Sequence, residues 1–402
     1  MKKLALAVLI GATTLGATAQ AECTYESDQT VTILSNSFQA WQAVTGAMAD
    51  CAPVEAELDS EYRTMQATAF DTDPSLYHLG GVANGTIRPL LDNRLIRPLD
   101  DLVERYSEQI NPNQLIRIDG EVMALGMMIN AQHLMYRRDI LDDLGLDVPE
   151  TYDEVLTVAE AIREDGSVRY PLGGTYASGW DLGQEFVNMY LGFGGEFFDG
   201  SQPAVNNEAG VQALEMMEAL TEYMDPEYLV SDSTYVQQQF QRGEIALANL
   251  WATRADAMND EAESEVVGLV GMAAAPAAYE GGHPATTLWW DGIVVARNIS
   301  DEAADNAFRV ALEGLSPRMV RENNDVAVWL IDGYEPTELS AGAAASADGG
   351  APGYPTRTEF GLMHTALGNN VADYLTGRRS AEAVLGAIED DYRTAAREQG
   401  LL

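Results

Sequence analysis

A tryptophan beside a carboxylate gives this chain its clearest site for chemistry. Trp180 precedes Asp181 in a glycine-rich segment, and Trp251 follows an apolar run. An indole offers a flat apolar face to the C–H side of a sugar ring, and a carboxylate accepts hydrogen bonds from hydroxyl groups. The alternative, that these indoles fill a core, stays open at this point.

A second such pair follows directly after another tryptophan. Trp289, Trp290 and Asp291 are consecutive. Successive side chains of a strand point to opposite faces, so one indole of the pair belongs to a core. We expect Trp290, with Asp291, to face a ligand.

Lysine is absent after Lys3, and this excludes several kinds of enzyme. Schiff-base enzymes, pyridoxal-phosphate enzymes and P-loop proteins all need a lysine. The four histidines are scattered and form no zinc-binding spacing. With 63 acidic residues, a carboxylate pair is easily found by eye and is no evidence for a glycoside hydrolase. We therefore expect no catalytic residues, no cofactor and no metal.

The charge balance is strongly acidic. The formal net charge is −40, and removing residues 1–21, with two lysines and no acids, leaves 63 acidic against 21 basic residues, a net −42. Such a surface suits salty water, where ions screen the repulsion. It also argues against nucleic-acid binding.

The N-terminus has the three parts of a secretory signal peptide. Two lysines precede an apolar stretch and an Ala-x-Ala end, so we expect cleavage after Ala21 and a periplasmic location. The only cysteines, Cys23 and Cys51, then lie in an oxidising compartment. We expect them to form a disulfide between the start of the chain and the end of its first helix.

Strand and helix patterns alternate along the chain. Apolar runs at 31–34 and 54–58 predict strands, with a helix at 38–50 between them. This alternation predicts α/β layers with largely parallel sheets. Further helices are expected at 140–144, 152–163, 209–223, 302–313 and 381–398, and Thr151, Ser300 and Ser380 are suited to cap three of them. The Ala/Gly/Ser-rich stretch 339–353 predicts a flexible surface connection.

Four segments, in order, resemble family 1 of the extracellular solute-binding proteins of ABC importers, whose best-known member is the maltose-binding protein. The most telling has MYRRDIL, LGL and VPETYDE within 135–154. The others are LIRPLD at 95–100, FQRGEIAL at 240–247, and DGIVVA with SDEAA within 291–304. Each pattern is weak by itself, but together they span most of the chain.

The resemblance implies a two-lobed periplasmic-binding-protein fold of type II, with a ligand cleft between lobes joined by crossover segments. We expect the first lobe at 22–130 and 293–345, and the second at 131–292 and 346–402. Crossovers are expected near 128–133, near 288–293 and in the stretch before Tyr354.

The resemblance also implies further ligand contacts. They are Asn36 after the first strand, Asn84 in the loop 80–85, Asn130 near the first crossover, and Arg357 in a late loop. At Asn130 the maltose-binding protein has a carboxylate, so the resemblance does not give the sugar preference of this chain. Trp41 of the first helix is a further candidate, with core packing as its alternative, and Arg357 is equally suited to a surface ion pair.

These observations favour a binding protein over an enzyme. We expect a monomer that binds a neutral sugar or polyol by lobe closure and delivers it to an inner-membrane ABC permease. The alternatives are a binder of another solute, such as a polyamine or an acidic sugar, and a secreted glycoside hydrolase.

Overall fold

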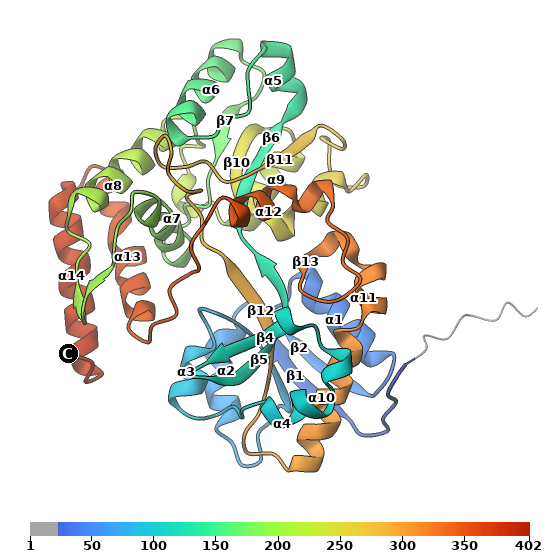
Figure 1. The fold of residues 1–402 in the computed structure, drawn as a ribbon. Coiled ribbons are helices and arrows are strands. Elements are labelled where there is room, and N and C mark those ends of the chain that lie inside the picture. Colours follow the sequence, from blue (N-terminus) through green and yellow to red (C-terminus); the bar gives the residue numbers. More distant parts are fainter. Residues whose placement is uncertain (1–22) are drawn as a thin grey trace, which may run out of the picture.

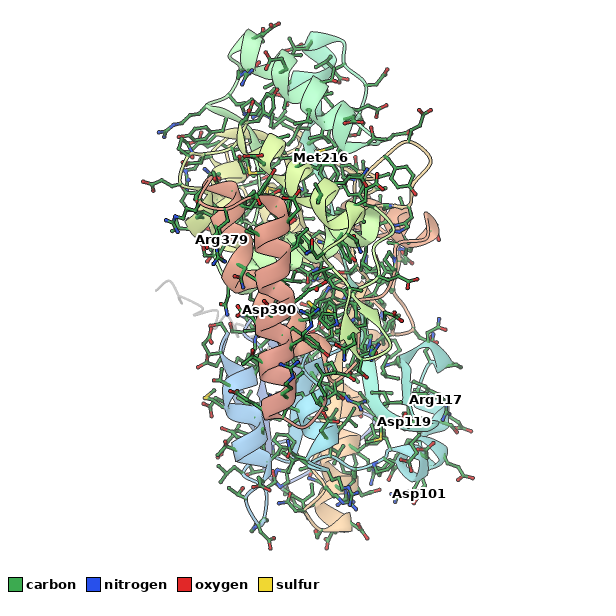
Figure 2. The ribbon with its side chains drawn as sticks, turned by 90° about the vertical axis from the view of Figure 1, so that its left-hand side faces the viewer. Asp101, Arg117, Asp119, Met216, Arg379 and Asp390 are labelled. Atoms are coloured by element: carbon green, nitrogen blue, oxygen red, sulfur yellow. A yellow bond between two sulfur atoms is a disulfide. The ribbon has the colours of Figure 1, made fainter. Side chains whose placement is uncertain are left out.

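A computed structural model describes residues 23–402, and the expected signal peptide at 1–21 lies outside the described residues. Figure 1 shows two lobes, one above the other, each with its own sheet and covering helices. Figure 2 turns the molecule so that α14 faces the viewer, with Met216 and Arg379 on the second lobe and Asp101 and Asp119 on the first. Between residues 23 and 402, no helix is long and apolar enough to cross a membrane. The predicted α/β class and two-lobed architecture are confirmed.

The first lobe is built on a seven-stranded sheet of order β13-β5-β12-β3-β1-β2, with β4 also paired to β5. Its apolar residues form two separate clusters of buried side chains. The strands are β1 (Val31–Ser35), β2 (Val54–Leu58), β3 (Leu79–Ala83), β4 (Leu115–Ile118), β5 (Glu121–Asn130), β12 (Trp289–Val295) and β13 (Val328–Trp329). The helices are α1 (Gln39–Ala49), α2 (Tyr62–Phe70), α3 (Arg88–Asp92), α4 (Asp100–Arg105), α10 (Asp301–Gly314) and α11 (Pro317–Glu322).

The second lobe is built on a four-stranded sheet of order β11-β6-β10-β7, with a small hairpin of β8 and β9 outside it. Most of its helices bury their apolar faces in one large cluster. The strands are β6 (Gln132–Arg137), β7 (Tyr170–Gly173), β8 (Phe198–Asp199), β9 (Gln202–Pro203), β10 (Ile245–Trp251) and β11 (Val270–Ala273). The helices are α5 (Arg138–Leu144), α6 (Tyr152–Asp165), α7 (Trp180–Gly192), α8 (Glu208–Thr221), α9 (Ser233–Gln241), α12 (Ala341–Asp348), α13 (Phe360–Leu375) and α14 (Ala381–Glu398).

Both sheets are mixed, so the expectation of largely parallel sheets is wrong. Among the strands between residues 23 and 402, the parallel pairs are β1 with β2, β1 with β3, and β7 with β10. The strands nearest the lobe boundary, β5, β6 and β12, pair antiparallel with their neighbours. These strands lead directly into or out of the crossings between the lobes, with no helix between β5 and β6.

The predicted helix starts agree closely with the structure where a periodic apolar pattern follows a suitable capping residue. Thr151 and Glu154 form a reciprocal capping box at the start of α6. Ser300 caps α10 by accepting from the Ala303 N–H, and Ser380 caps α14 in the same way. These side chains satisfy backbone donors that the first helical turn leaves free.

The stretch predicted as a flexible surface connection contains a helix instead. α12 packs against β11 and β6 of the second lobe and buries Ala343 and Ser346. A Cβ on its Gly342 would lie 2.5 Å from the His133 ring, so glycine is needed for this close packing. Low sequence complexity indicated a loop, but alanine is the best helix former and its small side chain permits a close approach.

The chain crosses between the lobes three times. Ala131 alone separates β5 of the first sheet from β6 of the second, as expected. The chain returns at the start of β12, so the predicted boundary at 292/293 falls inside that strand. It crosses again between β13 and α12, so the boundary at 345/346 divides α12. Sheet membership therefore moves both boundaries toward the N-terminus.

Cys23 and Cys51 form the predicted disulfide. It joins the segment before β1 to the end of α1. The Glu313 carboxylate of α10 accepts from the Tyr25 N–H at 2.8 Å beside it. The start of the described chain is thus fixed to two helices of the first lobe.

Candidate functional site

Two crossing segments are held to one helix of the second lobe by buried hydrogen bonds. Asn188 of α7 donates from Nδ2 to the Gln132 Oε1 at 2.5 Å. Its Oδ1 accepts from the Thr287 hydroxyl at 3.0 Å. Gln132 begins the strand after the first crossing, and Thr287 precedes the second. Both crossing segments are therefore fixed to α7 on the second lobe's side.

A carboxyl group completes this polar network. Glu185 of α7 accepts from the Gln132 Nε2 at 2.6 Å and from the Thr175 hydroxyl. Burial raises the pKa of Glu185 to about 7, and the two hydrogen bonds oppose this rise. The group lies beneath the hinge, where no solute can reach it.

Five rings, Trp180, Trp251, Trp289, Tyr354 and His364, form an aromatic cluster where the lobes meet. Trp180 lies 6.5 Å from Trp251 and 5.7 Å from Trp289 between ring centroids. Tyr354 packs on Trp289 at 4.0 Å. Trp180 is 37% exposed, whereas Trp289 and Tyr354 are buried. Trp180 is thus the ring most open to a ligand.

Chain turns at element ends bring these rings together. Trp180 is the first residue of α7 and follows Gly179, whose φ of +101° is a conformation that favours glycine. Trp251 is the last residue of β10, and Trp289 is the first of β12. Each indole therefore lies at the end of a strand or helix. At such a position a ring can be exposed without breaking the backbone hydrogen bonds of its element.

Trp289 is the buried member of the Trp289–Trp290 pair and belongs to the second lobe's core cluster, whereas Trp290 is half-buried. The two indoles point to opposite faces of β12: Trp289 joins the aromatic cluster, and Trp290 packs against a core cluster of the first lobe. That Trp290 faces a ligand stays a prediction. The alternation of side chains along a strand predicts only that the two indoles lie on opposite faces. Which one faces the second lobe depends on the register of β12, where Trp289 pairs with Asn130 at the crossing.

Charged groups surround the open face of Trp180. Burial raises the pKa of Asp181 to about 6, the nearby Asp232 raises it further, and Arg63 and Arg254 oppose this. The Arg63 guanidinium of α2, from the first lobe, lies 5.4 Å from the Trp180 ring centroid. Arg254 is largely buried three residues after Trp251. Both lobes thus contribute charge to the space beside this indole.

Asparagines from the first lobe's sheet line the crossings. Asn84 donates to the Leu288 carbonyl at 3.2 Å, and Asn130 donates to the Thr253 hydroxyl at 3.4 Å. Their Oδ1 atoms are buried with no hydrogen-bond partner among residues 23–402. Asn36 uses its own Oδ1 to accept from the Ser37 N–H at 2.7 Å. The first two amides retain acceptor capacity at the lobe boundary.

Trp41 and Asp291 are core residues and not open to a ligand. Trp41 is 1% exposed within the first lobe's core. Its indole hydrogen-bonds to the buried Asp291, whose pKa burial raises to about 7. Of the two alternatives for Trp41, the structure favours core packing, because the side chain is buried in the first lobe. Asp291 is sealed in β12 by the same packing.

A pocket of about 390 Å³ lies next to the aromatic cluster. Asn84, Gly85 and Arg88 line it from the first lobe, and Tyr354 and Arg357 from the second. Arg88 bridges the lobes by donating to the Thr358 hydroxyl at 2.7 Å. Arg357 instead donates to the Gly200 carbonyl at 2.9 Å and pairs with Glu359, so its guanidinium is engaged within its own lobe.

The structure places Trp180, Asp181 and Trp251 close together, and adds residues that sequence reasoning missed. Arg63 and His364 carried no recognisable motif, since their role depends on contact across helices or lobes. Trp289 was identified as the core member of its pair, and it is buried in the aromatic cluster. Arg254 directly follows the Trp251 segment, and that proximity was the one available signal.

The sequence profile of the bacterial extracellular solute-binding protein family matches residues 69–311, more than half of the chain. The chain belongs to this family. A probable ABC transporter-binding protein of Deinococcus radiodurans is 28% identical to this solute-binding protein over 286 residues. That match spans 66% of this chain and 65% of the relative's length.

Solved structures share the fold at low sequence identity. A solute-binding protein from Agrobacterium radiobacter K84, in complex with ribitol, has a TM-score of 0.81 and 22% identity. The match covers 92% of this solute-binding protein and all of that chain. A maltose-bound T. maritima protein matches with a TM-score of 0.76 and 18% identity, over 91% of this chain and 99% of its own. A D-mannitol-bound protein from Agrobacterium vitis S4 has a TM-score of 0.76 and 19% identity, over 92% and 99% of the two chains.

The two kinds of tryptophan should respond differently to truncation. Trp41→Ala should lower the free energy of unfolding by about 3–5 kcal/mol, because it opens a cavity in the first lobe's core. Trp180→Ala should cost about 1–2 kcal/mol, because the ring is partly exposed already. Urea denaturation of both variants measures this. Trp329→Ala, another buried indole of the first lobe, is the control and should behave like Trp41→Ala. Equal losses for Trp41 and Trp180 would contradict the placement of the site.

Proposed function

We propose that this chain is the periplasmic ligand-binding component of an ABC importer. It captures a neutral sugar or polyol between its lobes, as a monomer, and presents it to an inner-membrane permease. The observation that carries this proposal is the half-open indole of Trp180, with Asp181 beside it and Arg63 of the opposite lobe over its ring. The second lobe thus offers an apolar face from Trp180 and an acceptor from Asp181, and the first lobe offers a donor from Arg63.

Family membership and the ligands of the similar structures support this class of ligand. The similar solved proteins hold ribitol, D-mannitol and maltose. Polyols and sugars share dense hydroxyl groups and apolar C–H faces, which suit an indole with neighbouring acids and amides. The unpartnered oxygens of Asn84 and Asn130 are further acceptors for ligand hydroxyls.

The charges near Trp180 bear on the alternative ligands. Arg63 and Arg254 both act on the Asp181 carboxylate, and their positive charges oppose a polyamine. An acidic sugar is the second candidate, because one arginine from each lobe lies near the same indole. A glycoside hydrolase would need two reachable carboxyl groups. Glu185 and Asp291 are buried, so the carboxyl groups that remain near Trp180 for this alternative are those of Asp181 and Asp232.

Ligand binding should raise the melting temperature. Ribitol, D-mannitol and maltose are tested by thermal shift, with gluconate and spermidine representing the alternatives. A ligand at about 100 times its Kd adds about 2.7 kcal/mol of stability. We expect at least one of the three neutral compounds to stabilise the protein and Trp180→Ala to abolish the effect. Stabilisation by spermidine alone, or by none of the five, would reject the proposed ligand class.

Affinity for a neutral polyol should depend on the ionisation of Asp181. The ionised carboxylate accepts hydroxyl donors, and its pKa of about 6 means that this form is lost as the pH falls through about 6. Calorimetric titration should therefore give constant affinity above about pH 7 and weakening below it, by at most about tenfold per pH unit. Asp181→Asn should bind about tenfold more weakly at pH 8 and lose this inflection.

The matched control is Asp390→Asn on α14, which removes one carboxylate from the outer surface. It should keep the wild-type pH profile. A wild-type profile that stays flat from pH 8 to pH 5 would remove Asp181 from the ligand contacts.

A further inference from the structure

Both ring nitrogens of His364 have defined partners. His364 lies on α13 and is buried. Its Nε2 lies 2.9 Å from the Trp180 carbonyl oxygen, and its Nδ1 lies 2.8 Å from the Tyr354 hydroxyl. A carbonyl oxygen only accepts, so Nε2 carries the proton and Nδ1 accepts from Tyr354. The order of donors is therefore fixed from Tyr354 through His364 to Trp180.

Ring stacking is a second contact between His364 and Trp180. The His364 imidazole stacks on the Trp180 indole at 5.1 Å with an interplanar angle of 20°. One side chain thus holds both the backbone and the ring of Trp180. Because burial lowers the pKa of His364 to about 4, the imidazole stays neutral and keeps this donor arrangement at ordinary pH.

Helix packing leaves the imidazole little freedom to move. A Cβ on Gly183 of α7 would lie 3.0 Å from the His364 Nε2 and Cδ2 atoms. One helical turn on, a Cβ on Gly368 of α13 would collide with the Gly179 backbone before α7. Glycine at these positions lets α13 approach the first turn of α7 closely enough for His364 to reach the Trp180 carbonyl.

The first lobe lies close to Tyr354, the first donor of the series from Tyr354 through His364 to Trp180. A Cβ on Gly85, in the loop after β3, would lie 2.9 Å from the Trp289 ring and 3.3 Å from the Tyr354 ring. The Tyr354 ring therefore packs close to Gly85 of the first lobe, while the Tyr354 hydroxyl donates a hydrogen bond to His364. The Arg63 guanidinium is the charged group of the first lobe that acts on this assembly.

We propose that Tyr354 and His364 are positioning residues that fix the ligand-stacking orientation of Trp180, and that Tyr354 couples this orientation to contact with the first lobe. Neither residue needs to touch the ligand for this role. The inference rests on the proposed function in one respect, that Trp180 contacts the ligand. Its structural part is independent of any ligand.

The ligand-free test uses Tyr354→Phe, which keeps the ring on Trp289 and removes the donor to His364. Fluorine NMR of protein labelled with 5-fluorotryptophan resolves six indoles, and Trp180→Phe assigns the Trp180 signal. We expect Tyr354→Phe to shift or broaden that signal in the unliganded protein. Tyr392→Phe is the matched control, because it removes a buried hydroxyl bonded to the Ser201 carbonyl in the same lobe. It should leave the Trp180 signal unchanged.

Nitrogen NMR of histidine-labelled protein tests the donor order, since the chain has four histidines. We expect the Nε2–H tautomer for His364 in the wild type, and a change in its Nδ1 signal in Tyr354→Phe. An Nδ1–H tautomer in the wild type, or a Trp180 fluorine signal that Tyr354→Phe does not move, would overturn the proposal.

Binding of the neutral compound that stabilises the wild type gives the functional readout. We expect Tyr354→Phe to weaken it about tenfold, and Tyr392→Phe to leave it unchanged. Equal affinity of Tyr354→Phe and wild type would overturn the positioning role. Failure of the wild type to bind any of the three neutral compounds would instead reject the proposed function, and the NMR result would still decide the donor order.

Discussion

The structure depends on the attachment of two crossing segments to a single helix. Asn188 of α7 bonds to Gln132 after the first crossing and to Thr287 before the second. These bonds hold both segments on the second lobe's side, while the third crossing, between β13 and α12, is separate from them. The same helix begins with Trp180. The helix that anchors two of the three crossings therefore also carries the indole proposed to contact the ligand.

Burying Glu185 beneath this hinge has a cost that the polar network offsets. A carboxyl group taken from water favours its neutral form, and here burial raises the pKa of Glu185 to about 7 despite two hydrogen bonds. The folded state then binds a proton that the unfolded chain has released above about pH 4.3, so this group contributes less stability as the pH rises toward 7. Gln184 of α7 also donates to Asn188 and to Thr287, but its own Oε1 is buried with no partner among residues 23–402. The network is therefore satisfied at its donors and leaves one buried acceptor unpaired.

Local signals predicted local structure well. Strand β2 and helix α14 have the predicted bounds, since an alternating or periodic apolar pattern coincided with clear turns and caps. The disulfide followed from the presence of only two cysteines. The sequence allowed the prediction of Trp180, Asp181 and Trp251 as ligand contacts. These residue types suit a sugar, and they lie where a predicted loop meets a helix or a strand.

Properties that depend on distant pairing could not be predicted. The side of β12 that Trp289 occupies is set by its register with β5, and sequence alternation leaves the two sides equivalent. α12 was mistaken for a loop because its burial depends on the fit of Gly342 over His133. Arg63 reaches Trp180 only across the lobe boundary, and His364 reaches it only through close packing of α13 on α7. These contacts have no local signature.

The central claim is that a ligand on the Trp180 indole draws the lobes together about the two anchored crossings. Electron–electron distance measurement between spin labels at Asp101→Cys and Arg379→Cys tests it directly, because both positions are exposed and they lie on different lobes (Figure 2). The account predicts that the stabilising sugar or polyol shortens this distance in the wild-type background and leaves it unchanged in Trp180→Ala at the same ligand concentration. A bound ligand that leaves the wild-type distance unchanged, or an equal shortening in Trp180→Ala, would contradict it.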